Sequence, residues 1–252
     1  MKSICHLLRH SLCCLALCSG SVIAATFPVT NIADDGAGSL REAIALANAA
    51  AGPDVVDLSA IAGSTIDLSS GQLNISGSLT IEGSGVEIDA NITSRVFSIV
   101  SSGTVTINDT IVRRGFEIGG DGNGGGVRCE SSNLSLNNVS LFQNQANAGG
   151  GVFALNCLVS MNETVIEDNQ ANDGGGAWLE SDGGSLVLAN TRIGGNSASA
   201  AAGGLAVIMQ GGEFIMTDSE IEGNIVDSMA PSGSFVLDSG NSAGLALDIF
   251  EA

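Results

Sequence analysis

The stretch "GGGVRCESSNLSLNNVSLFQNQANA", Gly124 to Ala148, decides the fold because it recurs along the chain. "GGGVFALNCLVSMNETVIEDNQAND" begins 25 residues later, at Gly149, and "GGGAWLESDGGSLVLANTRIGGNSASAAA" begins another 25 residues later, at Gly174. A weaker copy, "GGLAVIMQGGEFIMTDSEIEGN", begins at Gly203. A fixed period of this length indicates a repeat architecture.

Apolar residues within each copy alternate with polar ones, as in β-strands. One apolar position follows the glycines, two alternating positions lie in the middle, and one lies near the end. Gly, Ser, Asn and Asp separate these runs, and they tolerate tight turns and positive φ angles. The three sets are Val127, Val152, Ala177 and Leu205; Leu134/Leu136, Val159/Met161, Leu186/Leu188 and Phe214/Met216; and Leu141, Ile166, Ile193 and Ile221.

Three short strands in about 25 residues make one turn of a coil, and stacked turns pair equivalent strands ~4.8 Å apart. The sequence therefore predicts an all-β, single-domain, right-handed parallel β-helix, in which residues 53–252 form about nine coils. Between residues 53 and 115 the pattern is less regular, but short runs such as "STIDLSS" still indicate coils. A β-sandwich would also have short alternating strands, but it would lack the repeat.

One polar column accompanies the apolar ones, three residues after the Leu/Ile position of each copy. Asparagine tolerates the left-handed conformation of a sharp turn, and stacked side-chain amides can hydrogen-bond from coil to coil. We expect a structural ladder here, with a row of ligand-binding amides as the alternative. Its members are Asn144, Asn169, Asn196 and Asn224.

Two cysteines, Cys129 and Cys157, lie within the repeats. Measured against the asparagine column, they are three residues out of step in neighbouring coils, which is ~10 Å along the strand direction. A disulfide requires Cα atoms within about 7 Å. The register therefore disfavours a disulfide, unless a local bulge or curled turn closes the gap.

Residues 26–52 precede the coils and predict an N-terminal cap with a helix at about residues 39–48. Ser39 and Glu42 match the N-cap and N3 positions of a capping box. Apolar residues then follow at i, i+3, i+4 and i+7, which gives the helix one apolar face. A solenoid exposes the core of its first coil, so a helix laid across it is the expected lid. The apolar face consists of Leu40, Ala43, Ile44 and Ala47.

The acids before this helix, Asp34 and Asp35, raise the alternatives of a phosphate-binding loop or a metal loop. The segment Gly36–Gly38 lacks the third glycine of the dinucleotide-binding fingerprint, and two acids beside it would repel phosphate. Two adjacent acids without further ligands do not make a metal loop. We expect Arg41 to pair with Asp34 or Asp35 and to fix the turn.

The first 25 residues predict a secretory signal peptide, because a basic start precedes a short apolar run and small residues. The apolar run is too short for a membrane anchor. A lipoprotein is disfavoured because Leu17 precedes Cys18, where a small residue is expected. We predict export to the cell surface or the extracellular space, or to the periplasm, and a mature chain without a transmembrane segment.

The amino-acid composition limits the classes of molecule that the chain can bind. Cleavage would remove both histidines and the only lysine, while all 27 acids would remain, so the formal net charge of −19 would become more negative. Such a chain repels nucleic acid and anionic membranes. The remaining expected partners are an extracellular polysaccharide or a cell-surface protein.

The segments Asp34–Gly36 and Ser39–Ile44, followed by Asn48 and Gly52, resemble the CSLREA-type N-terminal region of secreted bacterial β-helix proteins. One departure is Gly38, where that family often has cysteine. The recurring "GGG" and "xxN" motifs of the repeats are similar to those of polymorphic outer-membrane proteins and related autotransporter passenger domains. The resemblance implies a right-handed β-helix outside the cell, in proteins with adhesive or undefined roles. It provides no catalytic residues.

Catalytic candidates are weak. Arg113 and Arg114, with Asp109 and Glu117 nearby, are the best set for a polysaccharide lyase or glycoside hydrolase, but surface ion pairing also explains them. Carboxylates are the only usual general bases in a mature chain without lysine or histidine. Sugar clefts often use aromatic platforms, and Trp178 is the only tryptophan.

Calcium has two weak candidate sites, the glycine-rich segment 119–127 and the acids Asp168 and Asp173. The first lacks the acid of the calcium-binding nonapeptide at Gly124, and the second lacks a ligand spacing. We therefore assign no catalytic, cofactor or metal residues. We predict a non-enzymatic adhesion or surface-structural module, with a carbohydrate-active enzyme as the alternative.

Overall fold

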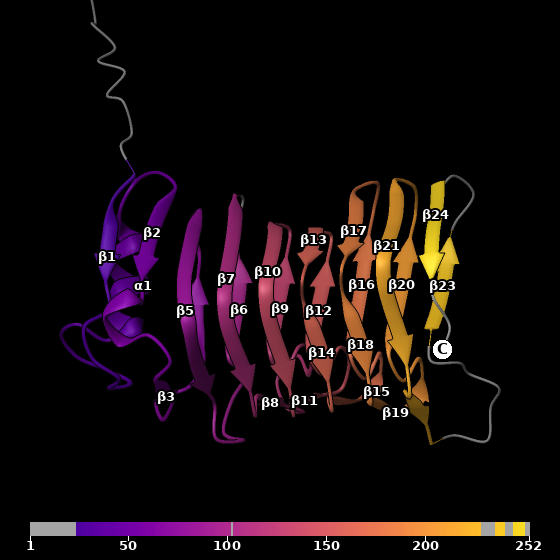
Figure 1. The fold of residues 1–252 in the computed structure, drawn as a ribbon, viewed down its shortest axis with the longest axis horizontal. Coiled ribbons are helices and arrows are strands. Elements are labelled where there is room, and N and C mark those ends of the chain that lie inside the picture. The colour runs from indigo at the N-terminus through magenta and orange to yellow at the C-terminus, as the bar shows by residue number, and fades with distance from the viewer. Residues whose placement is uncertain (1–23, 102, 228–234, 240–243, 250–252) are drawn as a thin grey trace, which may run out of the picture.

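The computed structural model describes residues 24–101, 103–227, 235–239 and 244–249, with backbone alone in the last two ranges. The chain forms a parallel β-solenoid of about seven turns, with one short helix near its N-terminus. Figure 1 shows the turns stacked side by side, from the helix at one end to β23 and β24 at the other. Residues 1–23 of the predicted signal peptide lie outside the described residues.

Three parallel sheets stack along the solenoid, of which the third begins only at residue 116. Sheet A contains β1 (Thr26–Pro28), β2 (Asp54–Asp57), β3 (Thr65–Asp67), β5 (Leu79–Asp89), β7 (Thr104–Arg113), β10 (Asn133–Phe142), β13 (Leu158–Asn162), β14 (Val165–Glu167), β17 (Ser185–Ala189), β18 (Arg192–Gly194), β21 (Glu213–Glu222) and β24 (Gly244–Ile249). Sheet B contains β4 (Leu73–Ile75), β6 (Phe97–Val100), β9 (Val127–Glu130), β12 (Val152–Leu155), β16 (Ala177–Ser181), β20 (Leu205–Met209) and β23 (Phe235–Ser239). Sheet C contains β8 (Phe116–Glu117), β11 (Gln145–Ala146), β15 (Gln170–Asp173), β19 (Ser197–Ala201) and β22 (Ile225–Val226).

The coils average about 27 residues rather than 25. Leu134 pairs with Val159 at the repeat spacing, but Val159 pairs with Leu186 and Leu186 with Phe214 at longer spacings, because turns such as Asp182–Gly183 gain residues. Longer coils give fewer turns, so the prediction of about nine coils was too high. The predicted apolar sets do fill the interior, and nearly all of their members are fully buried.

From β8 onward, each coil contains a fourth strand that the sequence pattern did not predict. Sheet C follows the asparagine position, and its strands are as short as two residues. Their inward residues Ala146, Ala171 and Ala198 are buried, whereas the neighbours on either side face outward. A strand with a single inward alanine gives almost no alternation, but the recurrence of that alanine in three copies was a usable signal.

The helix α1 (Leu40–Ala49) lies against β1, β2 and β4 and covers the first coil (Figure 1). Its four predicted apolar residues are all buried. The helix begins one residue after the predicted start because Ser39 is its N-cap in extended conformation. A short 3-10 helix, η1 (Ser59–Ile61), follows β2.

Candidate functional site

The four predicted asparagines lie in one buried row, which we call the asparagine corner (Asn144, Asn169, Asn196 and Asn224). The side chain of Asn144 donates to Oδ1 of Asn169 at 2.9 Å, Asn169 donates to Asn196 at 3.0 Å, and Asn196 donates to Asn224 at 2.9 Å. Each amide nitrogen also donates to a backbone carbonyl of the preceding coil. The first three are at most 1% exposed, so these amides hold coils together rather than offer a ligand surface.

A second polar row lies inside the bend in the middle of sheet A, where each coil has a positive φ angle. Thr164 donates from its hydroxyl to the carbonyls of Asn162 and Leu136, and Thr191 and Ser219 repeat the arrangement one and two coils later. The repeat pattern did not predict this row because Val139 interrupts it. We call it the hydroxyl corner; its members are Thr110, Val139, Thr164, Thr191 and Ser219.

Cys129 and Cys157 form a disulfide, contrary to the expectation from the register. Cys129 lies within β9, and Cys157 follows the turn after β12, where Asn156 has a φ of 53°. This left-handed residue turns the chain inward, so the two Cα atoms are only 6.5 Å apart. The curled turn therefore closes the three-residue offset, and the disulfide ties two neighbouring coils at the corner between sheets B and A.

The cap residues lie where the capping box would place them, with one difference. The hydroxyl of Ser39 accepts a hydrogen bond from the backbone of Glu42, but the carboxylate of Glu42 accepts from Gly38 rather than from Ser39. Ser39 instead donates its backbone N–H to Gly36, so a turn already satisfies that group. Both side chains stabilise the start of the helix.

Arg41 pairs with Asp34 at 2.7 Å and also donates to the carbonyls of Gly71 and Gln72. Burial alone would raise the pKa of Asp34, but hydrogen bonds from Arg41, Ser69 and Ser70 lower it to about 2. Asp34 thus links the cap to the first coils, whereas Asp35 only accepts from the backbone of Gly36.

The ion-pair partners of Arg113 and Arg114 are not Asp109 and Glu117, the acids predicted to lie near them. Both arginines bind the fully buried carboxylate of Asp89, and Arg113 also lies 2.6 Å from Glu87. Burial would raise the pKa of Asp89, but hydrogen bonds from Arg114 and Asn91 and the charges of both arginines lower it. The cluster is therefore an ion-pair lock between β5 and β7.

The glycine-rich segment 119–127 is held by arginines rather than arranged around a cation. Asp121 binds the nearly buried Arg95, and its other oxygen lies 2.8 Å from Nε of Arg128 as an ion pair without hydrogen-bond alignment. Arg95 also donates to the carbonyls of Asn123 and Gly124. Burial lowers the pKa of Arg95, and the acids around it oppose that shift.

Asp173 is the last residue of the short strand β15, and Asp168 lies in the turn that precedes this strand. Across the part of the chain that the structure describes, no group of three or more His, Cys, Asp or Glu side chains could hold a metal ion. In the same described residues, no helix is long and apolar enough to cross a membrane.

Trp178 has an aromatic neighbour, since it pairs in register with Phe153 of the adjacent coil. Phe153 is only 6% exposed, and the indole N–H of Trp178 donates to Glu180 at 3.4 Å. The pair is packed into the outer layer of sheet B rather than presented as an open platform.

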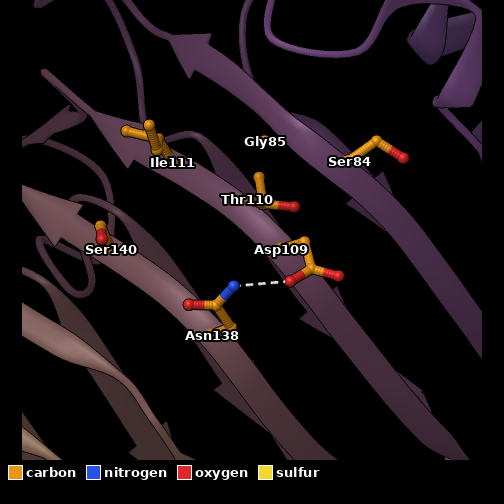
Figure 2. Close-up of a pocket in the computed structure, with 7 residues that line it drawn as sticks. All are labelled: Ser84, Gly85, Asp109, Thr110, Ile111, Asn138 and Ser140. Carbon is orange, nitrogen blue, oxygen red and sulfur yellow. Dashed lines mark hydrogen bonds between the residues drawn. The ribbon is translucent and has the colours of Figure 1, made fainter.

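An open hollow of about 380 Å³ lies outside the bend of sheet A, between β5, β7 and β10. It exists because β5 has extra residues there, so that Gly83, Ser84 and Gly85 all oppose Asp109. A side chain at Gly83 would lie 2.0 Å from the hydroxyl of Thr110, so the strand requires glycine. The hollow is lined by Ser84, Gly85, Asp109, Thr110, Ile111, Asn138 and Ser140 (Figure 2).

Asp109 provides the single carboxylate of this hollow. One of its oxygens accepts from the amide of Asn138 at 2.6 Å, as Figure 2 shows, and the residue itself is exposed. A carboxylate, an amide and hydroxyls in one open hollow can accept and donate hydrogen bonds to a polyhydroxylated ligand. The hollow has no second carboxylate for acid–base catalysis.

The outer face of sheet A beside this hollow is uncharged over four adjacent coils. We call it the hydroxyl–amide face. Its side chains alternate with the buried ones along β7, β10, β13 and β17. A second hollow of about 300 Å³ lies on it. The face consists of Thr104, Thr106, Asn108, Asn133, Ser135, Asn137, Leu158, Ser160, Asn162, Ser185, Val187 and Ala189.

Together, these features define the class of protein as a parallel β-solenoid. Its arginines after residue 25 are paired with acids, and its open surface is a flat sheet face with shallow hollows. No family model, curated protein or solved structure matches this chain.

Proposed function

We propose that this chain is an exported, non-catalytic β-solenoid that acts in adhesion or as a surface-structural module. The pairing of arginines with acids carries the proposal. Each of the six arginines after residue 25 lies within ion-pair distance of at least one carboxylate; the partners include Asp34, Glu87, Asp89, Asp121, Glu130, Glu167 and Glu222. Cations engaged in this way fasten coils and are poor candidates for catalysis.

Export is part of the same proposal. The start of the sequence has the features of a signal peptide. The disulfide between Cys129 and Cys157 supports the proposal, because such bonds persist in oxidising compartments outside the cytoplasm. The "DDGAGSLREAI" segment and the repeat motifs are the grounds for proposing kinship with CSLREA-type secreted proteins and autotransporter passenger domains. The strongly acidic charge favours a polysaccharide or a cell-surface protein over nucleic acid as partner.

A carbohydrate-active enzyme is the second candidate, and one observation favours it. The outward bend positions of sheet A alternate acid and amide along the coils, from Asp109 through Asn138, Glu163 and Asn190 to Asp218. Acids two coils apart are separated by ~9.6 Å of backbone, close to the upper end of the ~6.5–9.5 Å between carboxylates in inverting glycosidases. The alternation has a simpler cause, since it keeps like charges out of adjacent coils.

Two measurements on the mature chain, residues 26–252, test the proposal. Beads carrying the chain are applied to immobilised polysaccharides and matrix proteins, and we expect retention on at least one of them. The soluble chain is incubated with neutral and acidic polysaccharides in the presence of calcium, and we expect no released sugar. Sugar release by the wild type that is lost in Asp109→Asn and Glu163→Gln would overturn the proposal, as would beads that are retained on nothing.

A further inference from the structure

We propose that the hydroxyl–amide face binds a neutral, unbranched polysaccharide that lies along the solenoid axis. This inference rests on the proposed function, because it names the partner and the surface of a binding module. The face is the broadest part of sheet A that has no ion pairs, and one of the open hollows of the molecule lies on it.

Charge selects the class of ligand. The chain has a formal net charge of −19, yet none of the twelve side chains of this face is charged. Glu82 of β5 and Glu213 of β21 mark its two ends along the axis. An anionic polymer would be repelled by the whole molecule, and a cationic one would find no acids to pair with on the face. A neutral ligand that hydrogen-bonds through hydroxyl groups fits this distribution.

The side chains of the face provide unsatisfied hydrogen-bonding groups beside an apolar one. Within the described residues, the hydroxyls of Ser160 and Ser185 have no side-chain hydrogen-bond partner in the protein. Leu158 neighbours both serines, two residues before Ser160 on β13 and level with Ser185 of β17, and it is 46% exposed. A pyranose ring has hydroxyls at its rim and C–H groups on its face. The sugar can therefore accept and donate hydrogen bonds at the two serines while its apolar face packs on Leu158.

The spacing of the coils suits a repeating ligand. Ser135, Ser160 and Val187 occupy equivalent positions in successive coils, as do Asn133 and Leu158. Parallel strands place equivalent positions ~4.8 Å apart, close to the length of one sugar in an extended polysaccharide. Successive sugars along the axis would therefore meet equivalent side chains in successive coils.

The size of the face argues against a protein partner. Four strands of about five residues each cover roughly 300 Å², whereas a stable protein interface buries about 800 Å² per partner. A second copy of this chain or a folded protein would have to extend onto the charged bend and the second half of sheet A. A single polysaccharide chain would fit within the uncharged area.

The test measures binding of the mature chain to amorphous cellulose and chitin by depletion, and to a soluble neutral β-glucan by affinity electrophoresis, with alginate as the anionic comparison in the same electrophoresis. We expect binding to at least one neutral polymer and none to alginate. Ser160→Asp should weaken binding about tenfold or more, because it places a desolvated charge under the ligand. Leu158→Ala should weaken it less, about threefold to tenfold.

Matched controls on sheet C carry the same changes away from the face. Ser199→Asp and Ile225→Ala alter an exposed serine and an exposed apolar residue, and both should bind within about twofold of the wild type. Equal weakening by Ser160→Asp and Ser199→Asp would overturn the inference, and so would a preference for alginate or failure to bind any neutral polymer. If the beads still adhere to matrix proteins in those cases, the proposed function survives. Released sugar would instead contradict the proposed function, whereas the assignment of the hydroxyl–amide face as a polysaccharide-binding surface could still hold.

Discussion

The asparagine corner and the hydroxyl corner solve the same problem of satisfying buried polar groups at a turn, but they connect different parts of the chain. The asparagine amides bond each coil to the next, over separations of 25 to 28 residues. Each hydroxyl donates to the carbonyl two residues before it, and Thr164, Thr191 and Ser219 share that hydrogen with a carbonyl of the preceding coil at up to 3.5 Å. Only the first arrangement depends on having the same residue in every coil, which explains why Val139 is tolerated in the second.

One of the two largest expected effects is at the centre of the asparagine corner. Asn169→Ala would remove bonds to Asn144, Asn196 and the carbonyl of Leu141, and would leave the buried backbone N–H of Asn144 without its acceptor. We expect a loss of about 3 kcal/mol of unfolding free energy, measured by urea denaturation. Asn224→Ala, at the more exposed end of the row, is the control and should lose about 1 kcal/mol. Equal losses would show that the row does not act as a connected unit.

The disulfide allows a covalent link between coils to be compared with the amide link. It closes a sequence separation of 28 residues, for which chain entropy predicts about 3.6 kcal/mol of stabilisation. Reduction should therefore lower the melting temperature of the wild type. The double variant Cys129→Ala/Cys157→Ala should melt at the lower temperature and be insensitive to reductant. A wild type unaffected by reductant would contradict this expectation.

Lowering the pH should distinguish the Asp34 ion pair at the cap, which depends on charge, from the asparagine corner, which does not. The pKa of Asp34 is lowered to about 2 from an ordinary value of 3.8. The stabilisation by its ionised form is therefore complete above about pH 4 and disappears as the pH falls towards 2, a change of about 2 kcal/mol. Unfolding free energies of Asp34→Asn and the wild type should converge over this range. Asn169→Ala and the neighbouring variant Asp35→Asn should keep the pH dependence of the wild type.

A smaller effect is expected in the hydroxyl corner. Thr164→Val keeps the shape of the side chain and removes one hydroxyl that is shared between two carbonyls. Because those carbonyls have lone pairs for other donors, we expect a loss of about 1 kcal/mol in urea denaturation. A loss as large as that of Asn169→Ala would remove the distinction between the two corners.

The smallest effect should come from completing the hydroxyl row. Val139→Thr places a hydroxyl where Thr110 and Thr164 have one in the coils on either side, and the carbonyl two residues before it can accept its hydrogen. We expect the unfolding free energy to change by no more than about 0.5 kcal/mol. A clear destabilisation would show that the interior at this position has no room for a polar group.

The sequence predicted the parts of the fold in which one coil resembles the next. The apolar columns, the parallel stacking and the helix follow from alternation, repeat period and a capping pattern, all of which are local signals. The disulfide was missed because a single left-handed residue, Asn156, redirects the chain, and spacing along an ideal strand cannot contain that turn. Sheet C was missed because its strands are too short to alternate.

The candidate surfaces were harder to predict than the fold. The hollow beside Asp109 depends on extra residues at Gly83–Gly85 in one coil only, so no comparison of repeats would reveal it. The hydroxyl–amide face could have been found, because aligned copies show uncharged residues at Asn133, Leu158 and Ser185 and at the alternate positions that follow. Its absence of charge becomes informative only once these positions are known to share one face.

The asparagine corner also gives the solenoid a net dipole along its axis. All three amide-to-amide bonds run the same way, with the nitrogen of each side chain directed towards the next coil and its oxygen towards the previous one. Amide dipoles of about 3.5 D each therefore add head to tail along the axis, as they do in a helix. Each bond polarises the next, so the row strengthens as coils are added. Polarisation makes the two ends of the solenoid inequivalent, and a coil stacked in the reverse sense would place two amide nitrogens or two oxygens against each other.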